Sequence, residues 1–229
     1  MAPHVIVSYD NTQNDRDALM LGRLLHDLGA PLTLAYVRHA PLVDPAQERA
    51  AARSAAALLE HGAALLGEPF VDRRVLMSPS TSAGLAGLAG ELAAQVIVFG
   101  PEYRTPQGRV GIGRTAEALL ESGPTAVALA PAGYAECAGT RDLAIIGILP
   151  GTADEAAIET AFSLAARHEA RVTDRPHDAD LLVVGSRPQA RQGRVTISSS
   201  AARAVEQASV PVLVVARGAP LSFETLVTV

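Results

Sequence analysis

The chain has 229 residues, 48% of them hydrophobic, and a formal net charge of −5 at pH 7. This length holds one large or two small domains with a sizeable core, and the acidic balance argues against a nucleic-acid binder. All 19 basic residues are arginine, which excludes lysine-dependent phosphate loops and Schiff-base chemistry.

Short apolar strands alternate with helical patterns through the first half of the chain. Asp44 is predicted to cap a long helix that ends at Gly67, and the alternating pattern of 71–77 is typical of a strand near a sheet edge. Such an alternation of strands and helices predicts a parallel, doubly wound sheet. The predicted strands are 4–9, 32–37, 71–77, 96–99 and 125–130, and the predicted helices are 18–28, 45–66, 85–92 and 112–121.

A segment of small residues, 132–141, is predicted to be a linker. Beyond it, the strand 143–149 precedes a helix whose apolar face is expected to consist of Ile158, Ala161, Phe162 and Ala165. The last five residues, 225–229, are β-branched and apolar. We expect them to add to an unprotected strand near Val172 or to a neighbouring subunit.

The second half of the chain repeats the first at an offset of 85 residues. The openings of the two halves align at an offset of 139 instead, so 54 residues are missing from the second copy. These correspond to the long helix, the third strand and the third helix, which predicts a truncated second unit. The final strands of the two units are predicted to pair within one chain. The matching segments are 96–100 with 181–185, 107–110 with 192–195, and 126–130 with 211–215.

An aspartate turn after the first strand, a glycine stretch before a helix and a closing Pro-Val-Leu-Val-Val strand resemble the universal stress protein family in tandem form. The resemblance covers residues 4 to about 216. It implies an α/β fold of two Rossmann-like, doubly wound units. The implied division is a complete unit 1–131, a linker 132–141, a truncated unit 142–216 and a tail 217–229.

Nucleotide-binding members of that family wrap ATP phosphates with the stretch Gly-x2-Gly-x9-Gly-Ser/Thr, where backbone N–H groups and a helix N-terminus face the anion. The resemblance implies a role near the ribose for the carboxylate of Asp10 and an adenine contact for the backbone of Val37. Arg104 is a cation able to reach an anion. The implied nucleotide-binding residues are Asp10, Val37, Gly100, Arg104, Gly113 and Thr115.

This chain departs from the family motif in both copies. In the first, Tyr103 stands at the second glycine position and Arg114 at the closing position, just before Thr115. In the second, Leu149 stands where Asp10 does and Pro188 replaces the second glycine. An apolar side chain and a residue without an N–H both oppose nucleotide binding, so the second unit is predicted to be a structural copy.

The sequence has no Ser-His-Asp order, no nucleophile elbow and no His or Cys pair with metal-ligand spacing, so neither a catalytic nor a metal site is predicted. Two functions remain. The favoured one is a stress-response regulatory or scaffolding protein with at most weak nucleotide binding in the first unit. The other is an ATP- or AMP-binding universal stress protein with a functional site there. For Asp10, a turn at the start of a helix is an equal alternative to a ribose contact. For 108–113, a surface loop that caps a helix is an equal alternative to a nucleotide contact.

The expected partners are an adenine nucleotide and an unidentified protein. The tandem is expected to form an intramolecular pseudo-dimer, and a homodimer of the whole chain is a further alternative. The single cysteine, Cys137, and the lack of a signal-like N-terminus predict a cytoplasmic location. No apolar run is long enough to span a membrane, so no membrane contact is expected.

Overall fold

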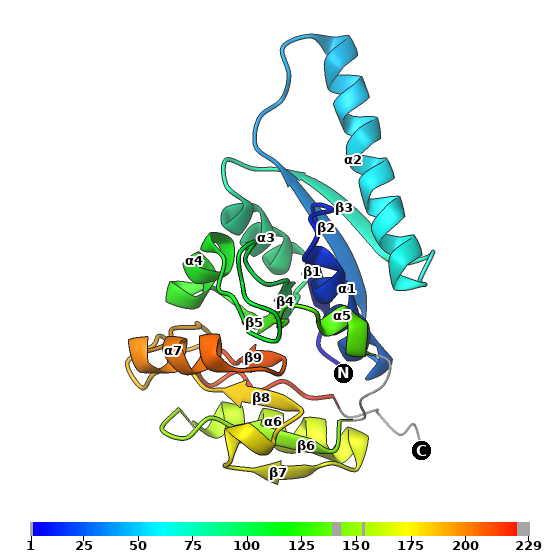
Figure 1. Ribbon diagram of the computed structural model, residues 1–229. Helices are drawn as coiled ribbons and strands as arrows, with labels where there is room; N and C mark the ends of the chain where they lie inside the picture. The colour runs from blue at the N-terminus through cyan, green and yellow to red at the C-terminus, as the bar shows by residue number, and fades with distance from the viewer. Residues whose placement is uncertain (1, 139–142, 153, 224–229) are drawn as a thin grey trace, which may run out of the picture.

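The computed structural model describes residues 2–138, 143–152 and 154–223, and within these residues nine strands form a single sheet (Figure 1). The predicted α/β class with a parallel-dominated sheet is confirmed. The strands are β1 Val5–Ser8, β2 Leu32–Arg38, β3 Asp72–Met77, β4 Val96–Phe99, β5 Ala126–Leu129, β6 Ile145–Ile148, β7 Arg171–Thr173, β8 Leu181–Val184 and β9 Val212–Val214. The helices are α1 Asp15–Asp27, α2 Pro45–Leu66, α3 Thr81–Glu91, α4 Arg114–Ser122, α5 Tyr134–Cys137, α6 Glu155–His168 and α7 Ser199–Gln207, with a 3-10 turn, η1, at Pro176–Asp178.

The order of strands across the sheet is β3-β2-β1-β4-β5-β9-β8-β6-β7. Every neighbouring pair is parallel except β5 and β9, which pair antiparallel with Ala128 opposite Leu213. The predicted pairing of the two final strands within one chain is therefore confirmed. Strand β3 is an edge strand, as its alternating pattern predicts, and β7 lies at the other edge.

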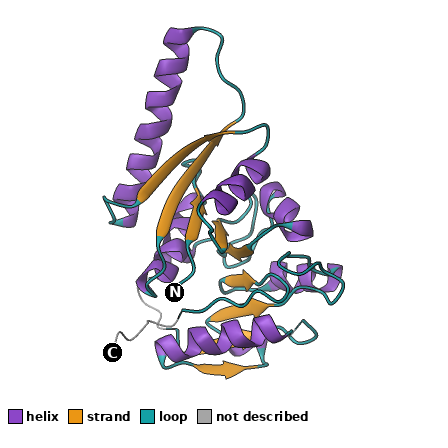
Figure 2. Cartoon of the chain, turned by 180° about the vertical axis from the view of Figure 1, so that it is seen from behind, coloured by secondary structure: helices purple, strands orange, loops and turns teal. Residues whose placement is uncertain are grey.

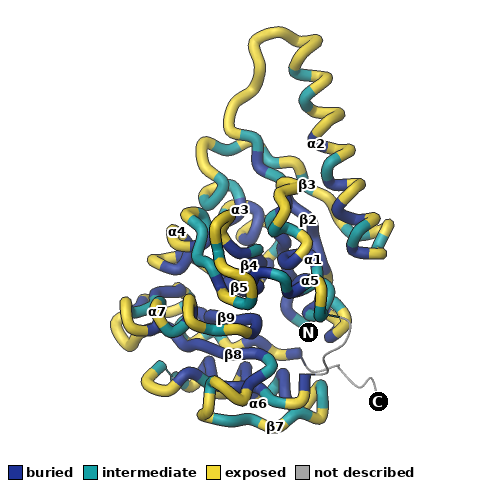
Figure 3. Tube along the Cα trace, viewed as in Figure 1, coloured by how far each residue is buried: buried dark blue, intermediate teal, exposed yellow. Residues whose placement is uncertain are grey.

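Helices cover both faces of the sheet (Figure 2). One face packs against α1, α2, α5 and α6, and buries Leu19 and Leu59 among others. The other face packs against α3, α4 and α7, and buries Leu85 and Val205. Buried residues line the strands throughout, whereas the N-terminal half of α2 is largely exposed (Figure 3).

Local chemistry accounts for the bounds of α2, which match those predicted from the sequence. The carboxylate of Asp44 accepts a hydrogen bond from the backbone N–H of Ala46 at 2.8 Å, which caps the first turn. Gly67 ends the helix with a positive φ of 78°, a left-handed conformation that favours glycine.

The segment 132–141, predicted to be a linker, contains the short helix α5, which packs on α1. The buried carboxylate of Asp17 accepts hydrogen bonds from the N–H groups of Gly133 at 2.9 Å and Ala135 at 2.7 Å. Burial raises the pKa of Asp17 above its ordinary value, while these two hydrogen bonds lower it. Small-residue composition is a weak sign of a linker here, because a distant side chain fixes the backbone.

The predicted apolar face of α6 is partly wrong. Ala161 and Ala165 are buried, but Ile158 is 39% exposed and Phe162 is 58% exposed. Ile158 corresponds to Leu19 of α1, which is fully buried under α2. Because the second half lacks a counterpart of α2 among its described residues, these side chains have no helix above them.

The chain after β9 partly replaces that cover. The N–H of Leu221 donates to Oγ1 of Thr160 at 2.9 Å, and the N–H of Phe223 donates to Oγ of Ser163 at 2.8 Å. Leu221 and Phe223 are both buried against the sheet face that carries α6. The predicted addition of 225–229 to an edge strand falls outside the described residues.

Candidate functional site

The carboxyl ends of β1 and β4 lie side by side in the sheet and bring the loop of Asp10 close to Gly100. This is the switch point of a doubly wound sheet, where ligands usually bind. Asp10 is exposed there. The neighbouring carboxylate of Asp15 accepts hydrogen bonds from the N–H groups of Asp10 at 2.7 Å and Thr12 at 3.0 Å.

Two carboxyl groups thus share this loop. Burial, and then the adjacent Asp10 carboxyl, raise the pKa of Asp15 from 3.8 to about 7. Near neutral pH the pair therefore carries less negative charge than two free aspartates. A second negative charge at this position would repel the phosphates of a nucleotide, so holding a proton on the pair lessens that repulsion.

Gly100 has a packing role that needs no ligand. A Cβ at this position would lie 2.4 Å from the backbone oxygen of Asn14, which is too close for any other residue. The side-chain amide of Asn14 also donates to the backbone oxygens of Pro101 at 3.2 Å and Glu102 at 3.1 Å. Gly100 is therefore required where the start of α1 crosses the end of β4.

Val37 lies near the carboxyl end of β2, the neighbour of β1, with its side chain in the core beneath α3. Its side chain is 7% exposed, and a Cβ added to Gly84 of α3 would lie 3.2 Å from its methyl groups. Gly113 is the N-cap of α4, with φ −74°, and Thr115 follows half-buried in the first turn. Gly113 thus lies at the start of a helix, as predicted, but its negative φ is a conformation that other residues also adopt.

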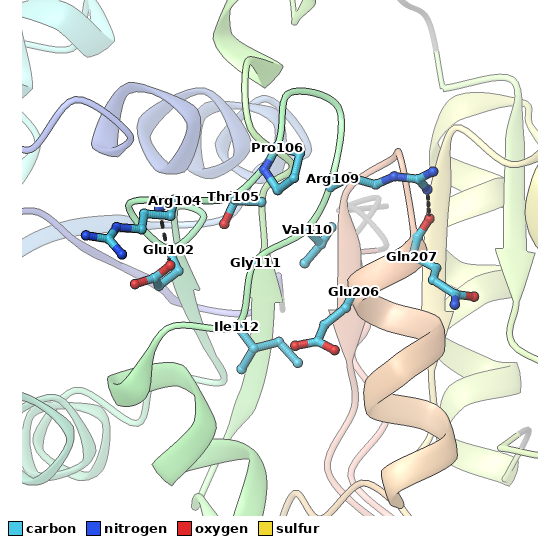
Figure 4. Close-up of a pocket in the computed structure, with 10 residues that line it drawn as sticks. All are labelled: Glu102, Arg104, Thr105, Pro106, Arg109, Val110, Gly111, Ile112, Glu206 and Gln207. Atoms are coloured by element: carbon cyan, nitrogen blue, oxygen red, sulfur yellow. Dashed lines mark hydrogen bonds between the residues drawn. The ribbon is translucent and has the colours of Figure 1, made fainter.

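Arg104 lies on a cavity of about 430 Å³ between the loop 101–112 and α7 (Figure 4). Glu102 and Thr105 flank it on the loop, and Glu206 and Gln207 of α7 lie opposite. Among the residues that line this cavity, neither Asp10 nor Val37 is present. Asp10, Gly100 and the backbone of Val37 thus lie at the carboxyl ends of neighbouring strands, whereas Arg104 lines a crevice facing the second half.

The repeated Gln-Gly-Arg-Val segments, 107–110 and 192–195, reach from each half to the other. We call these two segments the seam clamp. The N–H of Val110 donates to the oxygen of Ala208 at 3.1 Å, and the N–H of Val195 donates to the oxygen of Gly123 at 3.0 Å. The two donors, Val110 and Val195, are 85 residues apart, and so are the two acceptors, Gly123 and Ala208.

The arginines of the seam clamp follow the same rule. Arg109 donates from Nη1 to the backbone oxygen of Gln207, at the C-terminal end of α7 (Figure 4). Arg194 donates from Nη1 to the backbone oxygen of Ser122, at the C-terminal end of α4, at 3.3 Å. A cation at a helix C-terminus is favourable because the last carbonyls carry partial negative charge.

The glycines of the seam clamp hold each segment against its own half. The N–H of Gly108 donates to the oxygen of Ala132 at 2.9 Å, and that of Gly193 donates to the oxygen of Arg217 at 2.8 Å. Gly108 has φ +70° and Gly193 has φ +72°, which glycine adopts without strain. The sequence suggested phosphate contact for this stretch, and missed this seam role. The signal for it in the sequence is that Gln-Gly-Arg-Val recurs in the second half, although Leu149 and Pro188 stand there at two of the ligand positions.

The corresponding edge of the second half is occupied by its own polar groups. Oγ1 of Thr152 donates to the oxygen of Leu149 at 2.9 Å and accepts from the N–H of Gly185 at 3.2 Å. Oγ of Ser186 donates to the oxygen of Val215 at 2.8 Å. Leu149, at the position of Asp10, is 8% exposed.

Comparison with known proteins bears on this fold and its glycine loops. The model of the universal stress protein family matches residues 174–216, from just before η1 through β8 and the second copy of the seam clamp to just beyond β9. Over these residues the chain is similar to the universal stress protein family. No curated protein sequence matches it.

Solved structures extend the likeness in fold to nearly the whole chain. A universal stress protein from Archaeoglobus fulgidus DSM 4304 is similar at 14% identity and a TM-score of 0.58, over 93% of this chain and 98% of that one. A putative universal stress protein from Pseudomonas aeruginosa UCBPP-PA14 is similar at 14% identity and a TM-score of 0.59, over 93% of both. At such identities the likeness concerns the fold.

Two further features bear on the chemistry available. Among the described residues, no group of three or more His, Cys, Asp or Glu side chains is placed to hold a metal ion. The helices of the described part of the chain are all too short or too polar to cross a membrane.

Proposed function

We propose that this protein is a regulatory or scaffolding member of the universal stress protein family, with at most weak nucleotide binding in the first half. The observation that carries the proposal is the seam clamp. Its glycine N–H groups and arginine side chains are groups suited to phosphate, but the arginine side chains donate to backbone oxygens at helix ends of the other half, and the glycine N–H groups donate to backbone oxygens of their own half. A loop committed to the seam has fewer donors for an anion.

The second half supports a role without nucleotide. Leu149 offers no acceptor for a ribose hydroxyl, and Pro188 has no N–H to donate to a phosphate. The closing Gly-Ser pair is replaced by Ser198 and Ser199, and Oγ of Ser198 caps α7 by accepting from the N–H of Ala201 at 3.2 Å.

One observation favours the alternative, an ATP- or AMP-binding site in the first half. Asp10 is exposed at the end of β1, and Arg104 and Arg114 are exposed on the loop and helix beside it. A nucleotide at this edge would place its phosphates toward Gly113 and the start of α4, with Thr115 in the first turn. Val37 would contribute only through its backbone, because its side chain is buried.

Calorimetric titration with ATP and with AMP tests the proposal. We expect no more than one site per chain and a dissociation constant above roughly 100 µM. Any heat of binding should disappear in Asp10→Ala and persist in Leu149→Ala, the matched change in the second half. Two nucleotides per chain, or submicromolar binding that Asp10→Ala abolishes, would refute the regulatory proposal in favour of a nucleotide-dependent one.

A further inference from the structure

The second half has a cavity where the first half has a helix. In the first half, α3 packs against β1, β2, β4 and α4, and so covers that face of the sheet. The described part of the second half has no corresponding helix. Between α7 and the turn η1 lies a cavity of about 570 Å³, within the range of roughly 300–1,000 Å³ that is usual for small-molecule sites.

The floor of this cavity is apolar. Leu182 of β8, Leu149 after β6 and Val210 before β9 line it, each less than a tenth exposed. Ala204 of α7 lies at the side, at the position of Leu119 in α4. The smaller side chain of Ala204 therefore widens the space that the missing helix leaves.

The rim of the cavity carries donors and a positive charge. Arg109 arrives from the first half and His177 from η1, with Gln207 and Ser209 beside them. None of the described residues that line the cavity is acidic, although the chain as a whole carries a charge of −5. One N–H of the Arg109 guanidinium is directed to the oxygen of Gln207 (Figure 4), and the group has further N–H donors suited to a carboxylate.

We propose that this cavity binds a small anionic molecule with a compact apolar body, such as an aliphatic or aromatic carboxylate. The apolar body lies on Leu149, Leu182 and Val210, and the carboxylate accepts hydrogen bonds from Arg109 and His177 at the rim. This site goes beyond the proposed function and is separate from the nucleotide-binding edge of the first half. We expect one such site per chain, because α3 covers the equivalent face of the sheet in the first half.

Titrations of the full-length protein with phenylacetate and with octanoate, followed by amide chemical shifts in NMR spectra, test this site. We expect saturable shifts at Ser209 and Val210, and binding of phenylacetamide and octanamide at least about tenfold weaker, since they lack the charge that strengthens hydrogen bonds to Arg109. ATP should leave these shifts unchanged. If neither carboxylate binds, or if the amides bind as well, the proposal is overturned.

Paired variants separate binding from stability. Arg109→Gln should weaken carboxylate binding at least about tenfold, whereas Arg194→Gln, which removes the matching clamp contact outside the cavity, should leave it within about twofold. His177→Ala, at an exposed position, should weaken it without affecting folding. Ala204→Leu should abolish binding by filling the cavity, and Ala202→Leu on the same helix should not. Equal effects of Arg109→Gln and Arg194→Gln, or unchanged binding in Ala204→Leu, would contradict the site.

Discussion

The two halves of this protein share one part of their glycine loop and differ in another. Gln-Gly-Arg-Val is retained in both copies, and in both it donates to the backbone of the other half. The positions near a nucleotide differ, with Asp10 in one half and Leu149 in the other. The comparison teaches that a repeated glycine motif can be maintained by an internal interface, independently of a ligand.

The halves also differ in how the sheet is covered. Helices α2 and α3 lie over the two faces of the first half, whereas the second half has neither counterpart among its described residues. The chain after β9 covers part of one face through Leu221 and Phe223. The other face retains a cavity beside α7. Without counterparts of these two helices among its described residues, the second half leaves part of its sheet uncovered.

The largest expected effect concerns the glycine that follows β4 in the first half and its counterpart after β8 in the second. A Cβ at Gly100 would lie 2.4 Å from the backbone oxygen of Asn14, and one at Gly185 would lie 2.0 Å from that of Thr152. Replacing either with alanine should cost about 3 kcal/mol, because the backbone must shift to relieve the clash. Denaturant unfolding measures this, with Gly113→Ala as a control whose nearest non-local atom is 3.9 Å away. Equal stability of Gly100→Ala and Gly113→Ala would contradict the packing role.

A second prediction compares how the chain after each final strand is anchored. Asp17→Ala should lower the free energy of unfolding by about 2 kcal/mol, because the N–H groups of Gly133 and Ala135 lose a charged acceptor. Thr160→Val in the second half should cost about 1 kcal/mol, because only the N–H of Leu221 loses its acceptor. Chemical denaturation of the two variants gives both values. A smaller loss for Asp17→Ala would show that α5 is held by other contacts.

A third prediction uses pH to sharpen the difference between Asp10 and Leu149. The folded state raises the pKa of Asp15 from 3.8 to about 7. The folded protein therefore binds this proton more tightly than the unfolded chain, which adds to the free energy of unfolding. This contribution is complete below pH 3.8 and is lost as the pH rises through 7. Allowing for solvent screening, we expect the loss to be about 1 kcal/mol. Asp15→Asn should abolish it, and Asp10→Leu should lower the pKa of Asp15 in an NMR titration. An unchanged pKa in Asp10→Leu would show that the carboxyl pair does not interact.

The smallest effect is expected at the left-handed glycines of the seam clamp. Gly108→Ala and Gly193→Ala should each cost about 1 kcal/mol, since alanine is strained at a positive φ. The two losses should agree within about 0.5 kcal/mol and add in the double variant if the contacts act independently. Thermal unfolding of the three variants tests this. A loss confined to one copy would show that the clamp is not symmetric.

Periodicity and turn chemistry were sufficient to predict most of the fold. Asp44 and Gly67 defined the ends of α2, and the pairing of β5 with β9 was predicted, although not its antiparallel direction. The buried face of α6 could not be predicted, because apolar spacing does not reveal that the covering helix is missing. The fold of 132–138 on α1 depends on Asp17, which lies far away in sequence.

The candidate site was less predictable than the fold. The repeat identified 107–110 and 192–195 as matching segments but could not identify their hydrogen-bond partners, which are backbone oxygens brought near by the fold. Gly100 was assigned to phosphate by resemblance, whereas its contact with Asn14 depends on the crossing of α1 over β4. The cavity beside α7 arises from absent residues, which no local pattern records.

Hydrogen exchange at the amides of Val110 and Val195 tests the seam role of the glycine loops most directly. These N–H groups donate to Ala208 and Gly123 in the other half. The account predicts that both amides are protected to a similar degree without nucleotide, and that adding Mg-ATP changes neither. Rapid exchange at Val110 that slows only when ATP is added would contradict it, because the loop would then be ordered by a ligand rather than by the seam.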